Sequence, residues 1–229
     1  MKSDFDKLLR LDRESFALQQ IQKIFPSPFF IPVTSWSISP SAVLMIMNDI
    51  MINDRKHIIE FGSGMSTIYI AQLLKIYKPE SIIYSVESDM GWISQMERDL
   101  QRYDLADQVV FVHAPLTAPA AEIRFKDQTL WYDAASIDAI LGDATFDLVL
   151  VDGPFGGSSP FARYSAVPYI KSRLAPTYSV YLDDVHRATE QEIVVEWKNI
   201  LNCKVHQSPN ARHSRLHNTD GFNITPIFL

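Results

Sequence analysis

The sequence predicts an α/β protein whose mostly parallel sheet is covered by helices on both faces. From residue 57 onward, short apolar runs alternate with longer segments of helical periodicity, which is the pattern of repeated β–α units. The short runs are apolar at consecutive positions, as expected of strands that are buried on both sides. Each run also ends in small or polar residues, and ligands of open α/β sheets bind at those ends.

Residues 1–56 form a separate N-terminal segment. Leucine and isoleucine recur at helical spacing over 4–24 and predict an amphipathic helix. Residues 25–40 contain four prolines and are expected to be extended or irregular. A second helix begins at one of two serines around Pro40 and runs to Met51. We expect this segment to pack against the main domain or to lie over its site.

The elements of the main domain follow from the same reasoning. The strands are predicted over 57–62, 81–87, 109–115, 146–153 and 179–185, and the helices over 65–77, 90–104, 158–174 and 188–201. The 158–174 helix is expected to bend near Pro168. Residues 116–145 show no clean period and are interpreted as an excursion at the strand ends.

Two further strands are predicted to close the chain, over 203–209 and 222–229. The stretch between them is basic and contains Arg212, His213, Arg215 and His217. We interpret it as a solvated loop, with contact to a substrate or a partner as the alternative.

The composition limits the possible function classes. The 229 residues suit one domain with a small appendage, and the formal net charge of −6 argues against broad binding of a nucleic-acid backbone. The single cysteine, Cys203, excludes an internal disulfide framework and a cysteine-based zinc cluster. No apolar run approaches the ~18 residues of a membrane span, and the charged N-terminus lacks the apolar core of a signal peptide. We therefore expect a cytoplasmic protein.

Glycine is scarce in this chain, which makes its placement informative. The chain has eight glycines among 229 residues, which is about 3.5% and half the usual share of ~7%. Five of them fall in two short segments and are Gly62, Gly64, Gly153, Gly156 and Gly157. These segments follow the first and the fourth predicted strands, so they are the first places to look for a site.

The loop after the first strand predicts a nucleoside ligand. Gly62 and Gly64 let the backbone turn tightly and approach a ligand, and the next helix offers unpaired N–H groups that Ser66 or Thr67 caps. Thr67 stands where a dinucleotide-binding fingerprint needs a third small residue, and no phosphate-binding lysine follows. Glu87, at the end of the second strand, can accept hydrogen bonds from ribose hydroxyls. The alternative is a strand-to-helix turn without a ligand.

Several motifs resemble a known family. E-F-G-S-G-M-S-T, followed by V-E-S-D, resembles class I S-adenosylmethionine-dependent methyltransferases, in the variant whose third glycine is replaced by Ser-Thr. Five further motifs resemble a bacterial branch of these enzymes and are H-A-P-L, W-Y-D, F-D-L-V-L-V-D-G-P, R-Y and L-D-D-V-H-R. The resemblance covers about residues 57–201. It implies a Rossmann-like doubly wound sheet of seven strands in the order 3-2-1-4-5-7-6, with the last strand antiparallel, and assigns 57–229 to the methyltransferase domain.

The resemblance also implies a set of cofactor contacts. The residues concerned are Glu60, Gly62, Ser63, Gly64, Ser66, Thr67, Glu87, Ser88, His113, Ala114 and Asp152. The first four would cradle the methionyl part of S-adenosyl-L-methionine. Glu87 would hold the ribose with Ser88 nearby, His113 and Ala114 would flank the adenine, and Asp152 would lie near the methyl donor.

Acidic residues follow the fourth and fifth strands. Asp152, Asp183 and Asp184 lie at the ends of strands predicted to be neighbours, so all three can converge, and carboxylate oxygens suit Mg²⁺. The arrangement resembles metal-dependent O-methyltransferases of the catechol and macrolide-sugar type. In that chemistry the metal binds the substrate hydroxyls and lowers their pKa. The alternative is that Asp152 bonds a backbone turn or the cofactor, while Asp183 or Asp184 caps the next helix.

Four other residues are candidates for work on the acceptor. His186 follows the acidic pair and suits a general base near neutral pH, as a catalytic partner of Asp152, although a lone surface histidine is commoner. Trp131 and Tyr132 can wall the adenine or substrate pocket, or can form a hydrophobic plug under the long loop. Arg163 can bind an anionic substrate group or can pair with a local acid.

These observations together predict a methyltransferase. We expect in-line transfer of a methyl group from S-adenosylmethionine to an oxygen of a small molecule or sugar, with Mg²⁺ as a candidate helper. The alternatives are an NAD(P)-dependent oxidoreductase on the same sheet and an inactive cofactor-binding protein of the same fold. The expected partner is a small-molecule acceptor, without nucleic acid or membrane, and a homodimer is left open.

Overall fold

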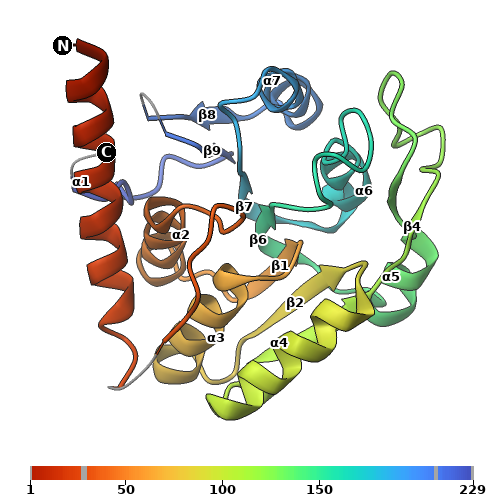
Figure 1. Cartoon of the computed structure of the whole chain (residues 1–229). Coiled ribbons are helices and arrows are strands. Elements are labelled where there is room, and N and C mark those ends of the chain that lie inside the picture. The colour runs from red at the N-terminus through yellow and green to blue at the C-terminus, as the bar shows by residue number, and fades with distance from the viewer. Residues whose placement is uncertain (1, 27–29, 209–210, 228–229) are drawn as a thin grey trace.

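A seven-stranded sheet runs through the centre of the molecule (Figure 1). The structure is a computed structural model and describes residues 2–26, 30–208 and 211–227. The strands of the sheet are β1 (His57–Phe61), β2 (Ile82–Glu87), β3 (Val109–His113), β6 (Phe146–Val151), β7 (Leu174–Leu182), β8 (Lys204–His206) and β9 (Ser214–His217). The helices are α1 (Lys2–Gln22), α2 (Pro40–Ile52), α3 (Met65–Tyr77), α4 (Met90–Arg102), α5 (Ala134–Leu141), α6 (Ala166–Ile170) and α7 (Ala188–Leu201), with 3₁₀ turns at Ala106–Gln108 and Lys171–Arg173.

The strand order confirms the predicted topology. The order is β3-β2-β1-β6-β7-β9-β8, which is 3-2-1-4-5-7-6 when the strands of this sheet are counted along the chain. The first five strands are parallel to one another, and β9 runs antiparallel to both β7 and β8. The switch in strand order lies between β1 and β6, and open α/β sheets bind ligands outside the carboxyl ends of the strands at such a switch.

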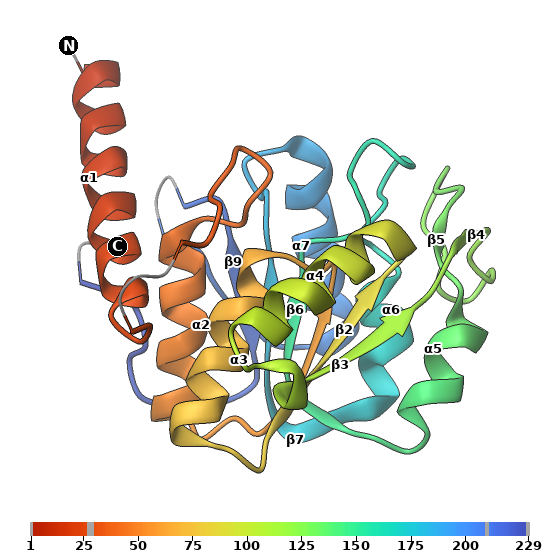
Figure 2. The same cartoon turned by 60° about the horizontal axis from the view of Figure 1, so that its bottom comes forward.

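Helices cover both faces of the sheet, as the apolar strands predict. Figures 1 and 2 show α2, α3 and α4 on one face and α5, α6 and α7 on the other. Successive residues of β1 point to opposite faces, so Ile58 belongs to the hydrophobic cluster beneath the first three helices and Ile59 to the cluster beneath the others. Both side chains are fully buried, which fixes the position of the loop that follows β1.

Helix α1 packs against α2 at the edge of the molecule (Figure 2). The Glu14 carboxylate accepts hydrogen bonds from the backbone N–H (3.0 Å) and the hydroxyl (2.7 Å) of Ser41, at the start of α2. An acidic side chain is favourable there because of the unpaired N–H groups and the helix dipole. No helix in the described part of the chain is both long enough and apolar enough to cross a membrane.

The last strand differs from the prediction. The strand is β9, within the stretch interpreted as a solvated basic loop, and the expected strand over 222–229 is wrong for the described residues 222–227. Arg215 of β9 is only 6% exposed, because its Nε contacts the Ser179 hydroxyl (3.0 Å) and the Asp49 carboxylate (3.3 Å). Charges that are neutralised by distant partners therefore concealed a buried strand. The expected ends at 209 and at 228–229, and residues 27–29, lie outside the described residues.

Asp49 holds α2 against the sheet. This fully buried carboxylate accepts hydrogen bonds from the Tyr181 hydroxyl (2.7 Å) and from Arg55 Nε (3.1 Å), and Arg215 also pairs with it. Burial alone would raise the pKa of Asp49, but the charges of Arg215 and Arg55 bring it below its ordinary value.

Two further segments correct the predicted elements. The helix expected over 158–174 is only α6, followed by a 3₁₀ turn, and β7 already begins at Leu174. The 116–145 excursion contains a small hairpin of β4 (Leu116–Thr117) and β5 (Trp131–Tyr132), followed by helix α5.

Candidate functional site

The loop after β1 is pressed against the loop after β6. Gly62 has φ +95°, a conformation that favours glycine, and its N–H donates to the Val86 carbonyl (2.8 Å). A Cβ added to Gly62 would lie 2.7 Å from the backbone nitrogen of Gly153, and one added to Gly153 would collide with the Tyr132 hydroxyl and with Gly62. The two glycines therefore let the loops at the switch point touch.

Gly64 faces open space at the start of α3. A Cβ added there would meet no atom of the described residues within 4 Å. Its N–H donates to the Thr67 hydroxyl (2.9 Å), so the Thr67 side chain satisfies one amide at the beginning of the helix, as the predicted cap requires. The space in front of Gly64 is therefore open, at the carboxyl end of β1 where such sheets bind ligands.

Glu60 supports this loop from inside the protein. Its fully buried carboxylate accepts hydrogen bonds from the hydroxyls of Ser66 (2.9 Å), Ser85 (2.7 Å) and Thr67. Burial raises the pKa of Glu60 to about 7, against the lowering effect of these hydrogen bonds. Glu60 thus reaches β2 and α3 from β1, while its contact with a cofactor remains a prediction.

Glu87 joins the loops after β1 and β2. One carboxylate oxygen accepts from the N–H of Ser63 (3.2 Å), and the other accepts from the N–H groups of Ser88 (2.6 Å) and Asp89 (3.0 Å). The indole N–H of Trp92 donates to the Ser63 carbonyl (3.0 Å) on the other side of the same loop. This network fixes a half-buried carboxylate beside the glycine loop.

His113 and Ala114 continue this edge after β3. The Ala114 N–H donates to the Glu87 carbonyl (2.9 Å), and a ring nitrogen of His113 lies 3.2 Å from the Ser88 carbonyl. Ala114 is fully buried, whereas His113 is exposed. Both residues lie beside the end of β2, and their contact with an adenine ring remains a prediction.

Three acidic residues converge beyond β6 and β7, as predicted. One carboxylate oxygen from each of Asp152, Asp183 and Asp184 lies within 4.8 Å of the other two. Arg163 lies among them. Its Nη2 is 3.0 Å from Asp152 Oδ1 and 3.1 Å from Asp184 Oδ2, and its Nη1 donates to the Asp183 carbonyl oxygen (3.0 Å).

Two more arginines surround Asp184. Arg187 Nη2 lies 2.9 Å from Asp184 Oδ2, and Arg212 Nη2 bonds Asp184 Oδ1. Burial alone would raise the pKa of Asp184, but the hydrogen bond from Arg212 and the charges of Arg163 and Arg187 bring it below its ordinary value. Asp184 is therefore an ionised anchor for three guanidinium groups.

The other two acids have the opposite shift. Burial raises the pKa of Asp152 to about 6, with the charge of Arg163 opposing the rise and that of Asp184 adding to it. Burial and the neighbouring Asp152 and Asp184 raise the pKa of Asp183 well above its ordinary value, and its Oδ1 has no hydrogen-bond partner among the described residues. Carboxyl groups in one site with separated pKa values can take different roles in proton transfer.

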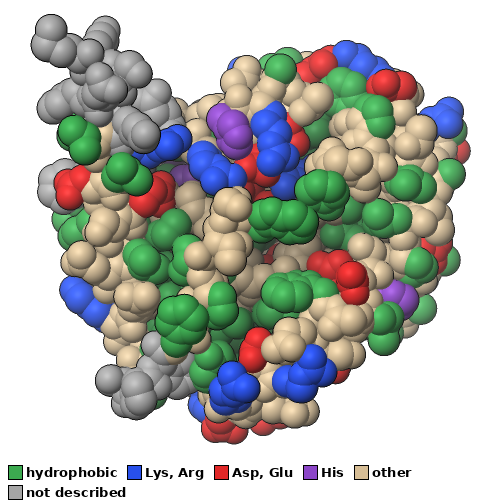
Figure 3. Space-filling view, viewed as in Figure 1, with side chains coloured by type: hydrophobic (Ala, Val, Ile, Leu, Met, Phe, Trp, Pro, Cys, Tyr) green, Lys and Arg blue, Asp and Glu red, His purple; other side chains and the backbone are tan. Residues whose placement is uncertain are grey.

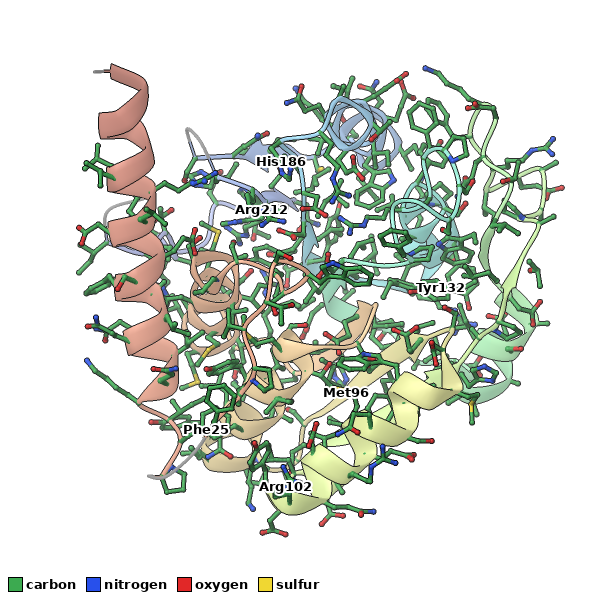
Figure 4. The ribbon with its side chains drawn as sticks, in the orientation of Figure 1. Phe25, Met96, Arg102, Tyr132, His186 and Arg212 are labelled. Carbon is green, nitrogen blue, oxygen red and sulfur yellow. The ribbon has the colours of Figure 1, made fainter. Side chains whose placement is uncertain are left out.

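His186 lies at the rim of this cluster, next to Arg212 (Figure 4). Its Nδ1 is 3.9 Å from Asp184 Oδ1, and its side chain is 52% exposed. Burial lowers the pKa of His186, Asp184 opposes this, and the nearby Arg212 and Arg187 add to the lowering. Figure 3 looks onto this end of the molecule and shows a hollow near its centre, with basic and histidine side chains along its upper rim.

Comparison with known proteins identifies the fold. No protein-family model matches the chain, and no curated protein matches it in sequence. Solved structures match over nearly all of it. The O-methyltransferase TomG from Streptomyces achromogenes, solved with S-adenosylmethionine, has a TM-score of 0.57 and 17% identity over 90% of each chain. An O-methyltransferase from Bacillus cereus, solved with S-adenosylhomocysteine, has a TM-score of 0.60 and 12% identity over 91% of each chain. The chain has the class I methyltransferase fold.

A fungal structure agrees with this assignment. The methyltransferase PaMTH1 from Podospora anserina, solved with S-adenosylhomocysteine, has a TM-score of 0.55 and 15% identity over 90% of this chain and 87% of its own. The structural neighbours thus include S-adenosylmethionine-dependent O-methyltransferases. These matches confirm the predicted resemblance at the level of the fold. They do not extend to the roles of single residues, because the sequence identities are too low.

Within the methyltransferase fold, three predicted substrate-binding residues are buried. Trp131 is fully buried against Phe61 and Tyr169, with ring centroids 5.7 Å and 5.2 Å away, so it forms the hydrophobic plug and not a pocket wall. Tyr132 is 2% exposed and lies behind Gly153. Arg163 is 4% exposed and pairs with the local acids, which is the alternative given for it.

The sequence did not single out the aromatic residues at the mouth of the site. The Trp36 ring, in the segment before α2, stacks on the Phe155 ring, after β6, with centroids 5.4 Å apart and planes at 11°. Trp36 is 82% exposed and Phe155 is 64% exposed. The only sequence feature that could have indicated this contact is Trp36 in a proline-rich segment. Its partner, Phe155, is more than a hundred residues away in the chain.

The second glycine segment packs around one of the arginines. A Cβ at Gly156 would lie 2.8 Å from Arg187 Nη1, and one at Gly157 would press on the Phe155 ring. These glycines therefore let the loop that carries Phe155 pack closely over the cluster of Asp152, Asp183, Asp184 and their three arginines.

Proposed function

We propose that the protein transfers a methyl group from S-adenosylmethionine to an oxygen atom of a small molecule or sugar. The observation that carries this proposal is the open space at Gly64 in a methyltransferase fold, on a loop that Glu87 bonds at Ser63 and that touches the loop after β6 at the switch point. The cofactors in the neighbouring structures from Streptomyces and Bacillus support it.

Each edge of this space would take one part of the cofactor. The methionyl group would lie along Gly62, Ser63 and Gly64, where the first amides of α3 favour a carboxylate. The Glu87 carboxylate would accept hydrogen bonds from the ribose hydroxyls, and His113 would lie beside the adenine. The bound cofactor supplies an activated methyl group on its sulfonium.

Asp152 is the residue best suited to accept the proton of the hydroxyl. A pKa of about 6 leaves Asp152 ionised at neutral pH, and its side chain keeps 20% of its surface exposed while Arg163 holds Oδ1. Asp152 would accept the proton of the acceptor hydroxyl, while the bound cofactor would supply the methyl group to the hydroxyl oxygen. The products would be a methyl ether and S-adenosylhomocysteine, with the proton on the Asp152 carboxylate. His186, at the rim, would take the proton onward to solvent.

A resident Mg²⁺ does not fit the acidic cluster as it is arranged. The three carboxylates lie close enough together to bind one ion, but Arg163 Nη2 already bridges Asp152 and Asp184 at 3.0 and 3.1 Å. A Mg²⁺ ion bound at 2.0–2.1 Å to these same oxygens would have to displace the guanidinium group. We therefore propose a mechanism without a metal step.

Within the N-terminal segment, 1–56, residues 30–39 would act as a cover for the site, while α2 packs on the sheet. The Trp36–Phe155 stack supports this role, because it connects the segment before α2 with the loop that follows Asp152. Two exposed aromatic rings that hold each other by stacking can separate at small cost, so the cover would open for exchange of cofactor and product.

A binding titration tests the cofactor half of the proposal. Calorimetry of the unmutated protein with S-adenosylmethionine and S-adenosylhomocysteine should show stoichiometric binding that NAD does not compete away. Preferential binding of NAD would favour the oxidoreductase alternative, and absence of binding to any of the three would overturn the proposal. Binding without methyl transfer to a panel of phenols and sugars would favour the inactive cofactor-binding protein.

A further inference from the structure

Arg163 occupies the place where a divalent cation would lie between the carboxylates. Its Nη2 lies within 3.1 Å of an oxygen from Asp152 and an oxygen from Asp184. Its Nη1 donates to the Asp183 backbone carbonyl at 3.0 Å, so the planar group is fixed on two sides. The residue is 4% exposed, and its position is set by protein contacts alone.

The carboxylates of this cluster are already paired without an added ion. Asp152, Asp183 and Asp184 each lie within 3.9 Å of a guanidinium group from Arg163, Arg187 or Arg212, and the buried Glu190 lies 3.7 Å from Arg187. Bound cations need an excess of ionised oxygen ligands, because these must replace the hydration shell of the ion. Here the guanidinium groups already take up the negative charge.

The ion pairs of Arg163 lie in a buried place, where each charge depends on its partner. Burial alone would lower the pKa of Arg163, but the charges of Asp152, Asp184 and Asp183 raise it above its ordinary value. Removing one member of a buried ion pair leaves the other uncompensated. Asp152 therefore depends on Arg163 both for its orientation and for its ionised form.

We propose that Arg163 is a built-in cation that replaces a divalent metal in this site and positions Asp152 for proton transfer. The inference rests on the proposed methyl transfer, in which Asp152 accepts the proton. Arg163 is a positioning residue and touches neither cofactor nor acceptor. Asp184 fixes it from behind, and Arg187 and Arg212 in turn hold Asp184.

Manganese titration tests this inference without any activity measurement. The electron paramagnetic resonance signal of free Mn²⁺ disappears when the ion is bound by a protein. The unmutated protein, purified with a chelator and dialysed, should leave the signal of one equivalent of Mn²⁺ unchanged. Stoichiometric loss of the signal, reversed in the Asp184→Asn variant, would overturn the inference. Because no cofactor is needed, this failure is separate from failure of the proposed function.

Substitution of Arg163 gives a second test with a chemical signature. Arg163→Ala should lower kcat by about 100-fold, as expected when a catalytic group loses its position, with little change in the affinity for S-adenosylhomocysteine. Millimolar guanidinium chloride, far below denaturing concentration, should restore at least a tenth of the lost rate. Arg173→Ala is the matched control, because Arg173 also pairs with an aspartate, Asp138 at 2.8 Å, but far from the site.

The outcomes separate clearly. Rescue by guanidinium together with chelator-insensitive turnover of the unmutated protein supports a built-in cation. Turnover that falls tenfold or more in a chelator and returns with Mg²⁺ overturns it, whatever Arg163→Ala does. If Arg163→Ala does not fold, the manganese titration and the chelator assay of the unmutated protein still decide the question.

Discussion

Replacing Gly62 by alanine should damage the site through the backbone alone. The substitution adds one methyl group at a residue with φ +95°, and that methyl would lie 2.7 Å from the backbone nitrogen of Gly153. The backbone of Gly153 cannot move aside as the flexible end of a side chain can. The loops after β1 and β6 would therefore have to move apart at the point where the cofactor is proposed to bind.

The loss of folding free energy can be estimated from the strained φ, the close contact and the effect of alanine on the unfolded chain. Alanine in the left-handed region costs about 1–2 kcal/mol. The short contact with backbone adds about 1–3 kcal/mol as overpacking, and the stiffer unfolded chain returns about 0.4–1 kcal/mol. The net loss for Gly62→Ala is roughly 3 kcal/mol, or about 6–12 °C in Tm for a domain of this size.

Two further glycines provide matched controls. Gly142 also has positive φ (+50°, with ψ −124°) but open space around its added Cβ, so Gly142→Ala should lose about 1–3 kcal/mol from backbone strain alone. Gly64 has open space and no strained φ, so Gly64→Ala should lose at most about 1 kcal/mol, as a poorer helix N-cap. If the open space at Gly64 is the cofactor cradle, Gly64→Ala nevertheless weakens S-adenosylhomocysteine binding at least tenfold.

The assay is thermal unfolding of the three variants, followed by calorimetry with S-adenosylhomocysteine. A Tm loss of less than about 3 °C in Gly62→Ala would refute the contact between the two loops. Unchanged cofactor affinity in Gly64→Ala would refute the cradle.

Three other predictions concern stability and access. Asp49→Ala should lower the free energy of unfolding by about 3–5 kcal/mol in urea titrations, because two buried guanidinium groups lose their partner; a loss below 1 kcal/mol would contradict this. The pKa of Glu60, raised from 4.5 to about 7, means that the folded state keeps a proton that the unfolded state loses, so stability falls as the pH rises through this range. Glu60→Gln should remove that fall, gaining about 3 kcal/mol relative to the unmutated protein between pH 4.5 and pH 8; parallel pH profiles would count against it. Trp36→Ala should leave Tm unchanged but speed release of S-adenosylhomocysteine at least threefold in stopped-flow experiments, whereas Phe222→Ala, another exposed aromatic, should change neither; equal release rates would exclude the cover.

The sequence predicted the centre of the fold well because strong local signals agree there. Strands β1, β2, β3 and β6 are apolar on both faces, so their positions follow from the run of residues alone. The strand order came from the family resemblance and was confirmed. The convergence of Asp152, Asp183 and Asp184 followed from the order in turn, because neighbouring parallel strands end at the same edge.

The edge of the sheet was predicted less well because its signals depend on distant partners. Arg215 in β9 resembles a loop residue until Asp49, from α2, neutralises it. Pro176 obscured the early start of β7, where the pairing with β6 is irregular between Phe146 and Leu148. Local periodicity carries no information about the ion pair of Arg215 or about the irregular pairing of β7.

The same limit applies to the site. Acidic residues beside one another in sequence favour a metal, and only the folded chain brings Arg163 and Arg212 to Asp184 across 21 and 28 residues. Trp131 fits a pocket wall or a plug equally well by residue type, and the packing of β5 against β1 decides between them. Residue type indicated the chemistry, while tertiary contacts determined which partner each group has.

The central claim is that S-adenosylmethionine binds at the switch point between β1 and β6 with its methyl donor facing Asp152. A crystal structure of the complex with S-adenosylhomocysteine tests it most directly. We predict the ribose within hydrogen-bonding distance of Glu87, the methionyl group along Gly62 and Gly64, and the sulfur facing Asp152. A nucleoside bound elsewhere on the protein, or a divalent ion in place of the Arg163 guanidinium, would contradict the account.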